Sequence, residues 1–201
     1  RIDEYRRFVF ESPAALVAQR MMGSTKVNFF HEHVLVKEPG TTKRTPWHQD
    51  QPYWTVDGDQ VCSIWVPLDV VPAESCVEFV AGSHRWGKWY TPRRFVDHAD
   101  HPTSNEGETI PDFDSRRDEF KFLSWDLEPG DCIVFHALTV HGAPGNTSLT
   151  TNRRAVSTRW TGDDARFARR EGYMSPPFEE VTLAPGDVMD CETFPVVLPS
   201  P

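Results

Sequence analysis

The sequence predicts a mainly β protein, an antiparallel sandwich or barrel such as a jelly roll, with a short helix near its N-terminus. Short runs of β-branched and aromatic residues recur along the chain, and turn-forming groups such as residues 38–40 and 144–146 separate them. Few segments carry a helical period. Short strands bounded by turns, with little helix between them, are typical of antiparallel sandwiches and barrels. The expected strands are residues 27–36, 61–71, 76–80, 120–125, 132–140 and 155–160.

The expected helix covers residues 14–22. Ser12 can cap its first turn, and Pro13 suits that turn because proline fixes φ near the helical value. Gly23 can end the helix, since glycine readily adopts the left-handed conformation found at helix C-termini.

The 201 residues suit one domain with a substantial core better than two domains. We expect a helical lead-in over residues 1–24, a β core over residues 25–162, and a proline-rich tail over residues 163–201 that wraps the surface. Residues 84–118 are polar, charged and too numerous for a tight connection. Loops of this length are usually functional lids or mobile segments.

The composition limits the classes of molecule that the chain is expected to bind. The net charge of −9 argues against binding of nucleic acid or of an anionic membrane. It says little about the substrate, which we expect to be a small molecule. No apolar run is long enough to span a membrane, and no signal peptide opens the chain. Isolated cysteines favour reduced thiols and a cytoplasmic location. Monomer and homodimer both remain open. The four cysteines are Cys62, Cys76, Cys132 and Cys191.

The strongest chemical signal is the pair His48 and Asp50. On an extended strand, residues two apart project to the same face, so both side chains can bind one metal ion. Such a pair alone is weak evidence. His141, at the end of the apolar run 132–140, adds a third ligand. Two imidazoles and one carboxylate occupy one face of an octahedral ion and leave three positions open, as in non-haem iron(II) oxygenases.

Arg153 opens an expected strand twelve residues after His141 and indicates which co-substrate the site binds. An arginine at this point can grip a carboxylate with two parallel hydrogen bonds, as a lysine cannot. The charges of a ferrous ion, Asp50, 2-oxoglutarate and Arg153 cancel. That balance suits a buried site, where an unpaired charge is costly.

These motifs resemble the phytanoyl-CoA dioxygenase family of iron(II)- and 2-oxoglutarate-dependent oxygenases. The resemblance implies a double-stranded β-helix, also described as a cupin-like jelly roll, and an enzyme that uses dioxygen to hydroxylate a small substrate while releasing succinate and CO₂. The matching stretches are residues 37–40, 45–50, 61–65, 79–84, 129–131, 135–136, 141–142 and 153–157.

The resemblance also assigns residues. It implies that His48, Asp50 and His141 hold the iron and that Arg153 pairs with the distal carboxylate of 2-oxoglutarate. Further co-substrate contacts are implied for three more positions, namely Gln49, Trp65 and His33.

Two departures from the family pattern concern the chemistry. Ala143 follows the distal His-Gly pair, so a side-chain hydroxyl contact to the co-substrate is absent there. Asp50 is a carboxylate, whereas related halogenases lack one at this position to make room for chloride. A hydroxylase is therefore favoured. The chain before the HxD motif is also shorter than in most family members.

The remaining histidines have simpler interpretations. His136 is expected to pack, His84 to fix a turn, and His31 to have a structural or pocket-lining role. The histidines within residues 97–101 are expected to lie in a solvated loop. Arg159 shares strand parity with Arg153, and an interior position near the substrate and a surface position at the strand end are equally open.

Two other functions remain open on the sequence. One is a cupin-type iron dioxygenase that binds its organic substrate directly, without 2-oxoglutarate; Arg153 argues against it. The other is a jelly-roll binding module without catalysis, for which a metal-ligand triad has no purpose.

Overall fold

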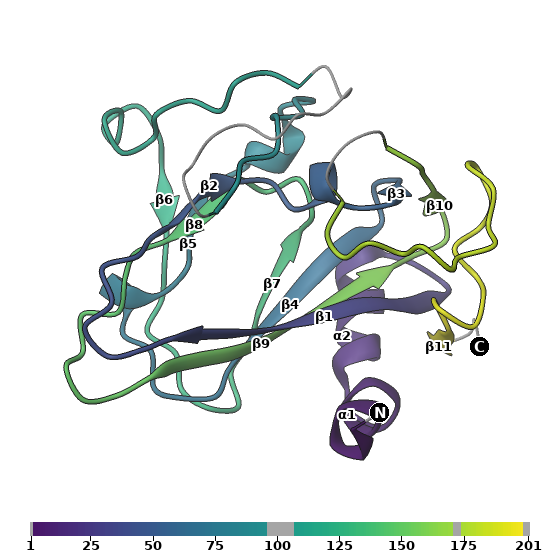
Figure 1. Ribbon diagram of the computed structural model, residues 1–201, viewed down its shortest axis with the longest axis horizontal. Coiled ribbons are helices and arrows are strands. Elements are labelled where there is room, and N and C mark those ends of the chain that lie inside the picture. Colours follow the sequence, from purple (N-terminus) through teal and green to yellow (C-terminus); the bar gives the residue numbers. More distant parts are fainter. Residues whose placement is uncertain (1, 96–106, 171–173, 199–201) are drawn as a thin grey trace.

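The computed structural model describes residues 2–95, 107–170 and 174–198 and forms the mainly β jelly roll that the sequence predicts (Figure 1). Two helices, α1 (Asp3–Glu11) and α2 (Ala14–Met22), precede the strands. The strands are β1 (Val27–Lys37), β2 (Thr45–His48), β3 (Val56–Asp57), β4 (Val61–Pro67), β5 (Glu78–Val80), β6 (Phe122–Leu123), β7 (Ile133–His136), β8 (His141–Ala143), β9 (Arg153–Thr161), β10 (Arg166–Phe167) and β11 (Val196–Leu198). Short 3₁₀ turns lie at η1 (Gln51–Tyr53), η2 (Ala73–Ser75) and η3 (Ser83–Arg85).

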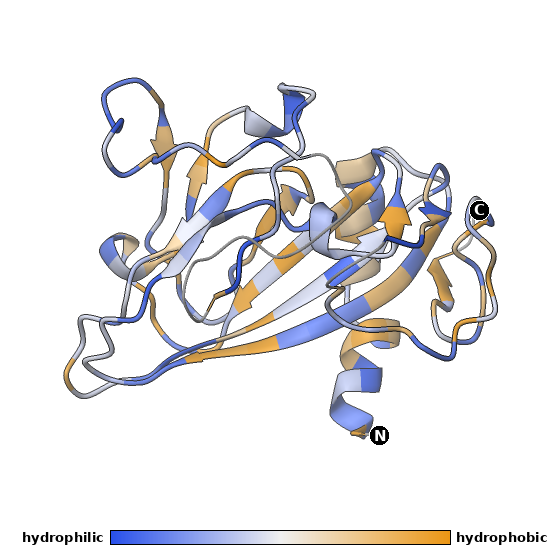
Figure 2. Cartoon of the chain, turned by 45° about the horizontal axis from the view of Figure 1, so that its top comes forward, coloured by the Kyte–Doolittle hydropathy of each residue, from blue (hydrophilic) through white to orange (hydrophobic). Residues whose placement is uncertain are grey.

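Two antiparallel sheets make up the body of the fold. The larger has the strand order β11-β1-β9-β4-β7, and the smaller has the order β2-β8-β5-β6. In Figure 1, β1 and β9 run side by side as the longest strands, while β2, β5 and β8 lie together at the upper left. Hydrophobic positions are frequent in the strands and in α2, as Figure 2 shows, because these elements supply the core between and behind the sheets.

The helices cover the outer face of the larger sheet. Ala15 and Ala18 of α2 pack in one cluster with Ile64 of β4 and Trp160 of β9. The inner face of the same strands is thereby left to face the smaller sheet. Neither helix that the structure describes is long and apolar enough to cross a membrane.

The first helix was not predicted from the sequence. Residues 3–11 are mostly charged or aromatic, and Val9 alone of them is buried, so the apolar content of this segment is low. The second helix has the predicted bounds and ends as predicted at Gly23, with φ of 63°. Its start differs: Pro13, expected in the first turn, occupies the N-cap position, and Ser12 precedes it and accepts a hydrogen bond from the Ala14 amide at 3.2 Å.

One predicted strand was wrong. Residues 132–140 were expected to form a single strand ending in a histidine, but β7 ends at His136 and the chain turns before β8 begins at His141. The two strands belong to different sheets. The turn is tied down by the Ala137 amide, which donates to the carbonyl of Val61, and by the Thr139 amide, which donates to that of His136.

The tail beyond residue 163 does more than wrap the surface. β11 pairs with β1 at the edge of the larger sheet. Met189 and Phe194 of the tail are buried in one cluster with Phe30 of β1 and Trp54. The tail therefore closes one end of the space between the sheets.

Candidate metal centre and its pocket

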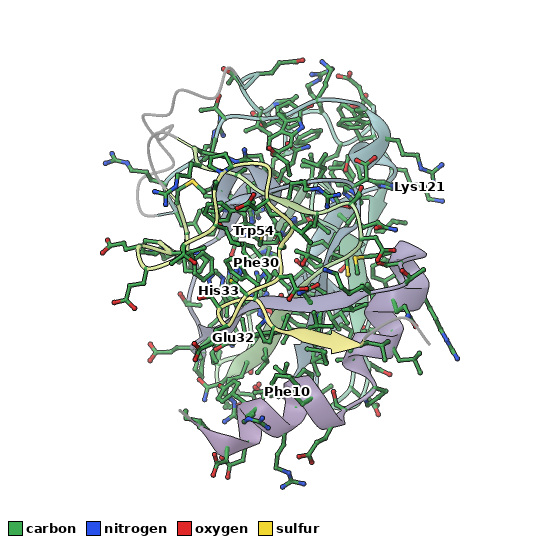
Figure 3. The ribbon with its side chains drawn as sticks, turned by 90° about the vertical axis from the view of Figure 1, so that its right-hand side faces the viewer. Phe10, Phe30, Glu32, His33, Trp54 and Lys121 are labelled. Carbon is green, nitrogen blue, oxygen red and sulfur yellow. The ribbon has the colours of Figure 1, made fainter. Side chains whose placement is uncertain are left out.

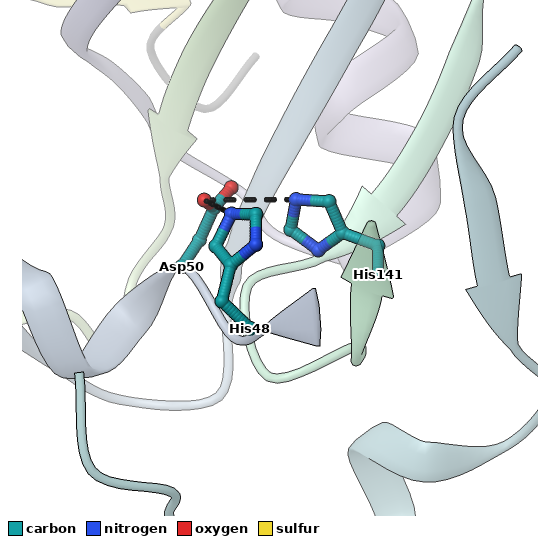
Figure 4. Close-up of side chains that lie close together, drawn as sticks. All are labelled: His48, Asp50 and His141. Carbon is teal, nitrogen blue, oxygen red and sulfur yellow. Dashed lines mark ion pairs between the residues drawn. The ribbon is translucent and has the colours of Figure 1, made fainter. Parts of the chain in front are cut away.

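Three ligand-type side chains meet between the sheets. His48 ends β2, His141 begins β8, and the two residues are register partners in the smaller sheet. Asp50 lies just beyond β2. One ligand atom from each residue lies within 4.8 Å of the others, and all three residues are buried. Nε2 of His48 is 3.6 Å, and Nε2 of His141 is 3.8 Å, from Oδ1 of Asp50 (Figure 4).

The backbone reaches this arrangement differently from the extended strand that we expected. Asp50 is not in a strand: its φ of −75° and ψ of −48° are helical, and it begins the 3₁₀ turn η1. The amides of Asp50 and Gln51 both donate to the carbonyl of Ala137, in the turn between β7 and β8. The carboxylate therefore reaches the two imidazoles because the turn that begins at Asp50 is hydrogen-bonded to the turn between β7 and β8. The alternation of side chains along a strand plays no part.

Hydrogen bonds orient each side chain. Nδ1 of His48 lies 2.8 Å from the carbonyl of Pro46, and Nδ1 of His141 lies 2.9 Å from the carbonyl of Thr139. Because a carbonyl only accepts, Nδ1 carries the proton in each ring, which leaves the Nε2 lone pair directed at the common centre. The Ser63 hydroxyl donates to Oδ2 of Asp50 at 2.9 Å and leaves Oδ1 free.

The electrostatics fix the protonation states that a metal requires. Burial alone raises the pKa of Asp50, but the nearby His141, Arg159 and His48 outweigh it and hold the pKa well below its ordinary value. Burial, aided by His48, lowers the pKa of His141 to about 4. An ionised carboxylate beside a neutral imidazole is ready to bind a divalent cation without first losing a proton.

A cavity of about 580 Å³ opens beside this centre. Its walls include apolar and aromatic side chains from both sheets and several basic residues, and Asp50 is the sole carboxylate residue among the described residues that line it. The lining residues are His33, Leu35, Val36, Lys37, Thr45, His48, Asp50, Tyr53, Trp54, Trp65, Val77, Arg93, Arg94, Phe95, Phe135, His141, Gly142, Ala143, Arg153, Ser157, Arg159 and Ser175.

Several polar atoms of this lining lack partners within the protein. Oγ of Ser157, Nε1 of Trp65 and Nε of Arg159 are buried and without a hydrogen bond among the described residues. Arg153 is 5% exposed and donates from Nη1 to the Ser75 carbonyl at 2.6 Å, and no described carboxylate pairs with it. Buried donors without acceptors are costly, so this lining fits a polar, anionic guest.

Of the three further residues that the sequence assigned to co-substrate contacts, two line the cavity and one does not. Trp65 and His33 line the cavity. Gln49 does not line it: its amide nitrogen donates to the carbonyls of Lys88 and Leu138, and its oxygen accepts from the Tyr90 amide. Gln49 therefore tethers the segment after η3 to the turn between β7 and β8.

The other histidines have separate places. His31 is buried beside Trp54, with 5.1 Å between ring centroids. His84 and His136 stack on each other at 5.4 Å, outside the cavity lining. Residues 97–101 lie outside the described residues, as do the other residues of 96–106 within the expected loop 84–118.

The role of Ser63 was not predicted from the sequence. The sequence could have indicated it, because Ser63 lies two residues before Trp65 on one strand, which places both side chains on the inner face of β4. The strand partner of both β1 and β4 is β9, and Ser157 pairs with His33 on one side and with Trp65 on the other.

The chain is similar in sequence to known proteins of one family. The family model described as phytanoyl-CoA dioxygenase matches residues 1–156. A probable phytanoyl-CoA dioxygenase of Caenorhabditis elegans is 28% identical over 171 residues, which cover 78% of this chain and 50% of the relative. A phytanoyl-CoA dioxygenase domain-containing protein 1 homolog of the same organism is 30% identical over 119 residues, covering 57% and 40%. The chain thus spans about half the length, or less, of these curated relatives.

Solved structures share the fold. The non-heme alpha ketoglutarate dependent carbocyclase SnoK from nogalamycin biosynthesis superimposes with a TM-score of 0.73 at 24% identity, covering 96% of this chain and 71% of that one. The epimerase SnoN, solved in complex with Fe3+, alpha ketoglutarate and nogalamycin RO, gives a TM-score of 0.71 at 23% identity, with coverage of 98% and 74%.

Proposed function

The chain belongs to the phytanoyl-CoA dioxygenase family, and on that premise we propose that it is an iron(II)- and 2-oxoglutarate-dependent dioxygenase that hydroxylates a small organic substrate. Succinate and CO₂ are the accompanying products. The observation that carries the proposal is the convergence of His48, Asp50 and His141 beside a cavity that also contains the buried Arg153.

The donor set fits a ferrous ion. Two neutral imidazoles and one ionised carboxylate are borderline and hard ligands, which suit iron(II) and leave half of an octahedron open. When bound, the ion supplies the coordination positions and the electrons for the reaction of 2-oxoglutarate with dioxygen. His48 and His141 hold it through Nε2, with each ring fixed by a backbone carbonyl at its Nδ1.

Arg153 positions the co-substrate. Its guanidinium has one backbone acceptor, the Ser75 carbonyl, and spare N–H groups to receive the distal carboxylate of 2-oxoglutarate. Ser157 lies four residues after Arg153 on the same face of β9, and its buried hydroxyl is free to donate a hydrogen bond. The cavity walls of Trp65 and Phe135 exclude water from the bound co-substrate.

Hydroxylation is the outcome we assign to the site because Asp50 occupies the coordination position that a halide would need. Its carboxylate accepts a hydrogen bond from Ser63 and lies near the charge of Arg159, so it remains ionised. We place the substrate in the part of the cavity lined by Tyr53, Trp54 and Phe95.

Anaerobic spectroscopy tests the centre directly. Addition of iron(II) and 2-oxoglutarate to the wild-type protein should produce a visible charge-transfer band, and Asp50→Ala and His141→Ala should lack it. His136→Ala, which removes a half-buried imidazole outside the cavity, is the matched control and should keep the band. Absence of the band in the wild type, or its persistence in both ligand variants, contradicts the proposal.

Turnover tests the co-substrate. A screen of metabolites that reads succinate release should find compounds that raise the rate above the uncoupled background. If Arg153→Ala leaves the 2-oxoglutarate dependence of that rate unchanged, the assignment of 2-oxoglutarate fails, and a dioxygenase that binds its organic substrate directly takes its place.

A further inference from the structure

The inner face of the larger sheet forms a ladder of polar side chains. Arg153, Ser157 and Arg159 of β9 line the cavity, whereas Ala155, on the same face of the strand, packs in the core. At the ~3.3 Å rise of a strand residue, the two arginine Cα atoms stand roughly 20 Å apart. Lys37 of β1 pairs in register with Arg153, whereas His31 of β1 and Ser63 of β4 flank Arg159.

Arg159 stands at the metal end of that ladder. Its register partner Ser63 is the residue that hydrogen-bonds Asp50. Arg153, six residues away on the same strand, donates instead to the carbonyl of Ser75. The two guanidinium groups therefore serve different parts of one cavity.

The contacts of Arg159 within the protein leave most of its hydrogen-bonding capacity unused. It is 5% exposed, Nη1 donates to the carbonyl of Ser157, and the guanidinium carbon lies 5.6 Å from the ring centroid of Trp54. Nε is buried without an acceptor among the described residues, and no described carboxylate forms an ion pair with this arginine. A buried guanidinium in this condition calls for an anion.

Charge balance gives the same result. A ferrous ion, Asp50, 2-oxoglutarate and Arg153 together are neutral, so Arg159 leaves one buried positive charge over. The neighbouring imidazoles of His31 and His33 cannot offset it, because an imidazole is either neutral or cationic. Among the described lining residues, Arg153 and Arg159 are the two buried arginines and Asp50 is the one carboxylate.

We propose that Arg159 is a substrate-binding residue and that the primary substrate is an organic acid whose carboxylate pairs with it. This inference rests on the proposed function, since it takes the far end of the ladder to be filled by 2-oxoglutarate. The substrate carboxylate lies beside the metal, against the face of Trp54, and Tyr53 and Phe95 form the remaining wall. An acid with an apolar or aromatic body fits these surroundings.

Aromatic side chains hold Arg159 and its neighbours in place. Trp54 is 2% exposed and packs edge-on against Phe30 at 5.7 Å between ring centroids, with His33 nearby on β1 (Figure 3). A guanidinium on a fixed indole face keeps its fork oriented, which favours two parallel hydrogen bonds to one carboxylate.

The same guanidinium could instead receive the metal-proximal carboxylate of 2-oxoglutarate, and a binding experiment distinguishes the two carboxylates. The protein is loaded with zinc(II) and saturated with N-oxalylglycine, an unreactive analogue of 2-oxoglutarate. The probe is 4-fluorobenzoate, titrated by fluorine NMR, with the neutral 4-fluorobenzamide as its isosteric control. The protein variants are Arg159→Gln, Arg159→Lys and Arg153→Gln, each checked for wild-type thermal unfolding.

We expect 4-fluorobenzoate to bind the wild type saturably and roughly 10–100-fold more weakly to Arg159→Gln, the loss typical of a charged hydrogen bond. Arg159→Lys should lie between the two because it keeps the charge but not the fork. Binding of 4-fluorobenzamide should not depend on Arg159. Binding of N-oxalylglycine should weaken strongly in Arg153→Gln and by less than about 3-fold in Arg159→Gln.

Three results overturn the inference. They are no saturable binding of 4-fluorobenzoate to the wild type, equal affinity in Arg159→Gln, and a loss of N-oxalylglycine binding in Arg159→Gln as large as that in Arg153→Gln. The proposed function fails separately: if the wild type binds neither zinc(II) nor N-oxalylglycine but binds 4-fluorobenzoate through Arg159, the carboxylate site stands and the oxygenase does not.

Discussion

His48 and His141 are register partners across β2 and β8, and their ring centroids lie 4.2 Å apart. The metal centre is therefore part of the strand pairing itself, since the two imidazoles come from segments ninety-three positions apart that meet only when the smaller sheet forms. A ligand that bridges these rings should hold the sheet together.

Metal binding is accordingly expected to stabilise the fold. Nickel(II), which does not react with dioxygen here, should raise the free energy of unfolding by about 2.7 kcal/mol at a concentration 100 times its Kd. For a chain of this size that is a rise of roughly 5–10 °C in Tm. Differential scanning fluorimetry measures the shift. Asp50→Ala should abolish it and His84→Ala should preserve it, and an equal shift in Asp50→Ala would speak against a shared site.

Arg153 and Arg154 make a matched pair for testing the co-substrate. Arg153 faces the cavity, whereas Arg154 is exposed and binds Asp69 through Nη2 at 2.6 Å. Arg153→Lys should raise the KM for 2-oxoglutarate roughly 10–100-fold, because a lysine cannot make the bidentate contact. Arg154→Lys should leave the KM within about 2-fold. Initial rates of succinate release check both, and similar KM values for the two variants would remove Arg153 from its assigned role.

The sequence was sufficient for the fold class, the family and the convergence of three ligand-type residues, because these depend on residue types that recur at fixed strand and turn positions. It was insufficient where backbone direction changes within an apolar run. Nothing in the composition of residues 132–140 distinguishes one strand from the two strands of different sheets that are observed. Tertiary hydrogen bonds from Ala137 and to its carbonyl fix that turn.

The sequence predicted which elements carry the site residues better than it predicted what each side chain contacts. Gln49 lies between two ligands in the sequence, just beyond the end of β2, yet its amide lies outside the cavity lining, where three backbone groups satisfy it. Arg159 was undecided between surface and interior, and burial of β9 on both faces near its end settles it inside. Local pattern gives the face of a strand but not what covers that face.

Ser63 should matter for metal affinity although it touches no metal. Its hydroxyl is the donor to Oδ2 of Asp50, and the side chain is fully buried. Ser63→Ala should weaken nickel(II) binding roughly 10–100-fold, the usual effect of losing a residue that orients a ligand. Ser63→Thr, which keeps the hydroxyl, should restore most of the affinity. Isothermal titration calorimetry decides the matter, and Ser63→Ala with wild-type affinity would show that Asp50 needs no such support.

His33 should make the fold less stable in acid. Burial, with the nearby charge of Arg159, lowers its pKa from 6.5 to about 4, so the unfolded chain binds a proton between these values that the folded chain does not. Stability is therefore lost as the pH falls from 6.5 towards 4 and is unaffected above 6.5. After allowance for its partial exposure, His33 should account for about 1–2 kcal/mol. Urea unfolding at pH 7 and pH 4.5 should show a smaller acid loss in His33→Gln than in the wild type, and equal losses would exclude this residue as the cause.

Gly142 offers the sharpest test of how strand pairing positions the metal ligands. A Cβ added there would lie 3.2 Å from the carbonyl oxygen of Thr45 and 3.2 Å from Cδ2 of Trp47, both on β2. Gly142→Ala must therefore displace β2 from β8, at a cost of about 1–3 kcal/mol in the free energy of unfolding. Because His48 ends β2 and His141 begins β8, the same displacement should weaken nickel(II) binding.

A double-mutant cycle separates that displacement from a general loss of stability. Trp47→Leu removes one of the two obstructing groups, so the combined variant should be less destabilised than the sum of the single changes by about 0.5–3 kcal/mol, and part of its nickel(II) affinity should return. Strict additivity in urea unfolding, together with unrecovered nickel(II) binding, would mean that the glycine is required for a reason other than the close approach of β2.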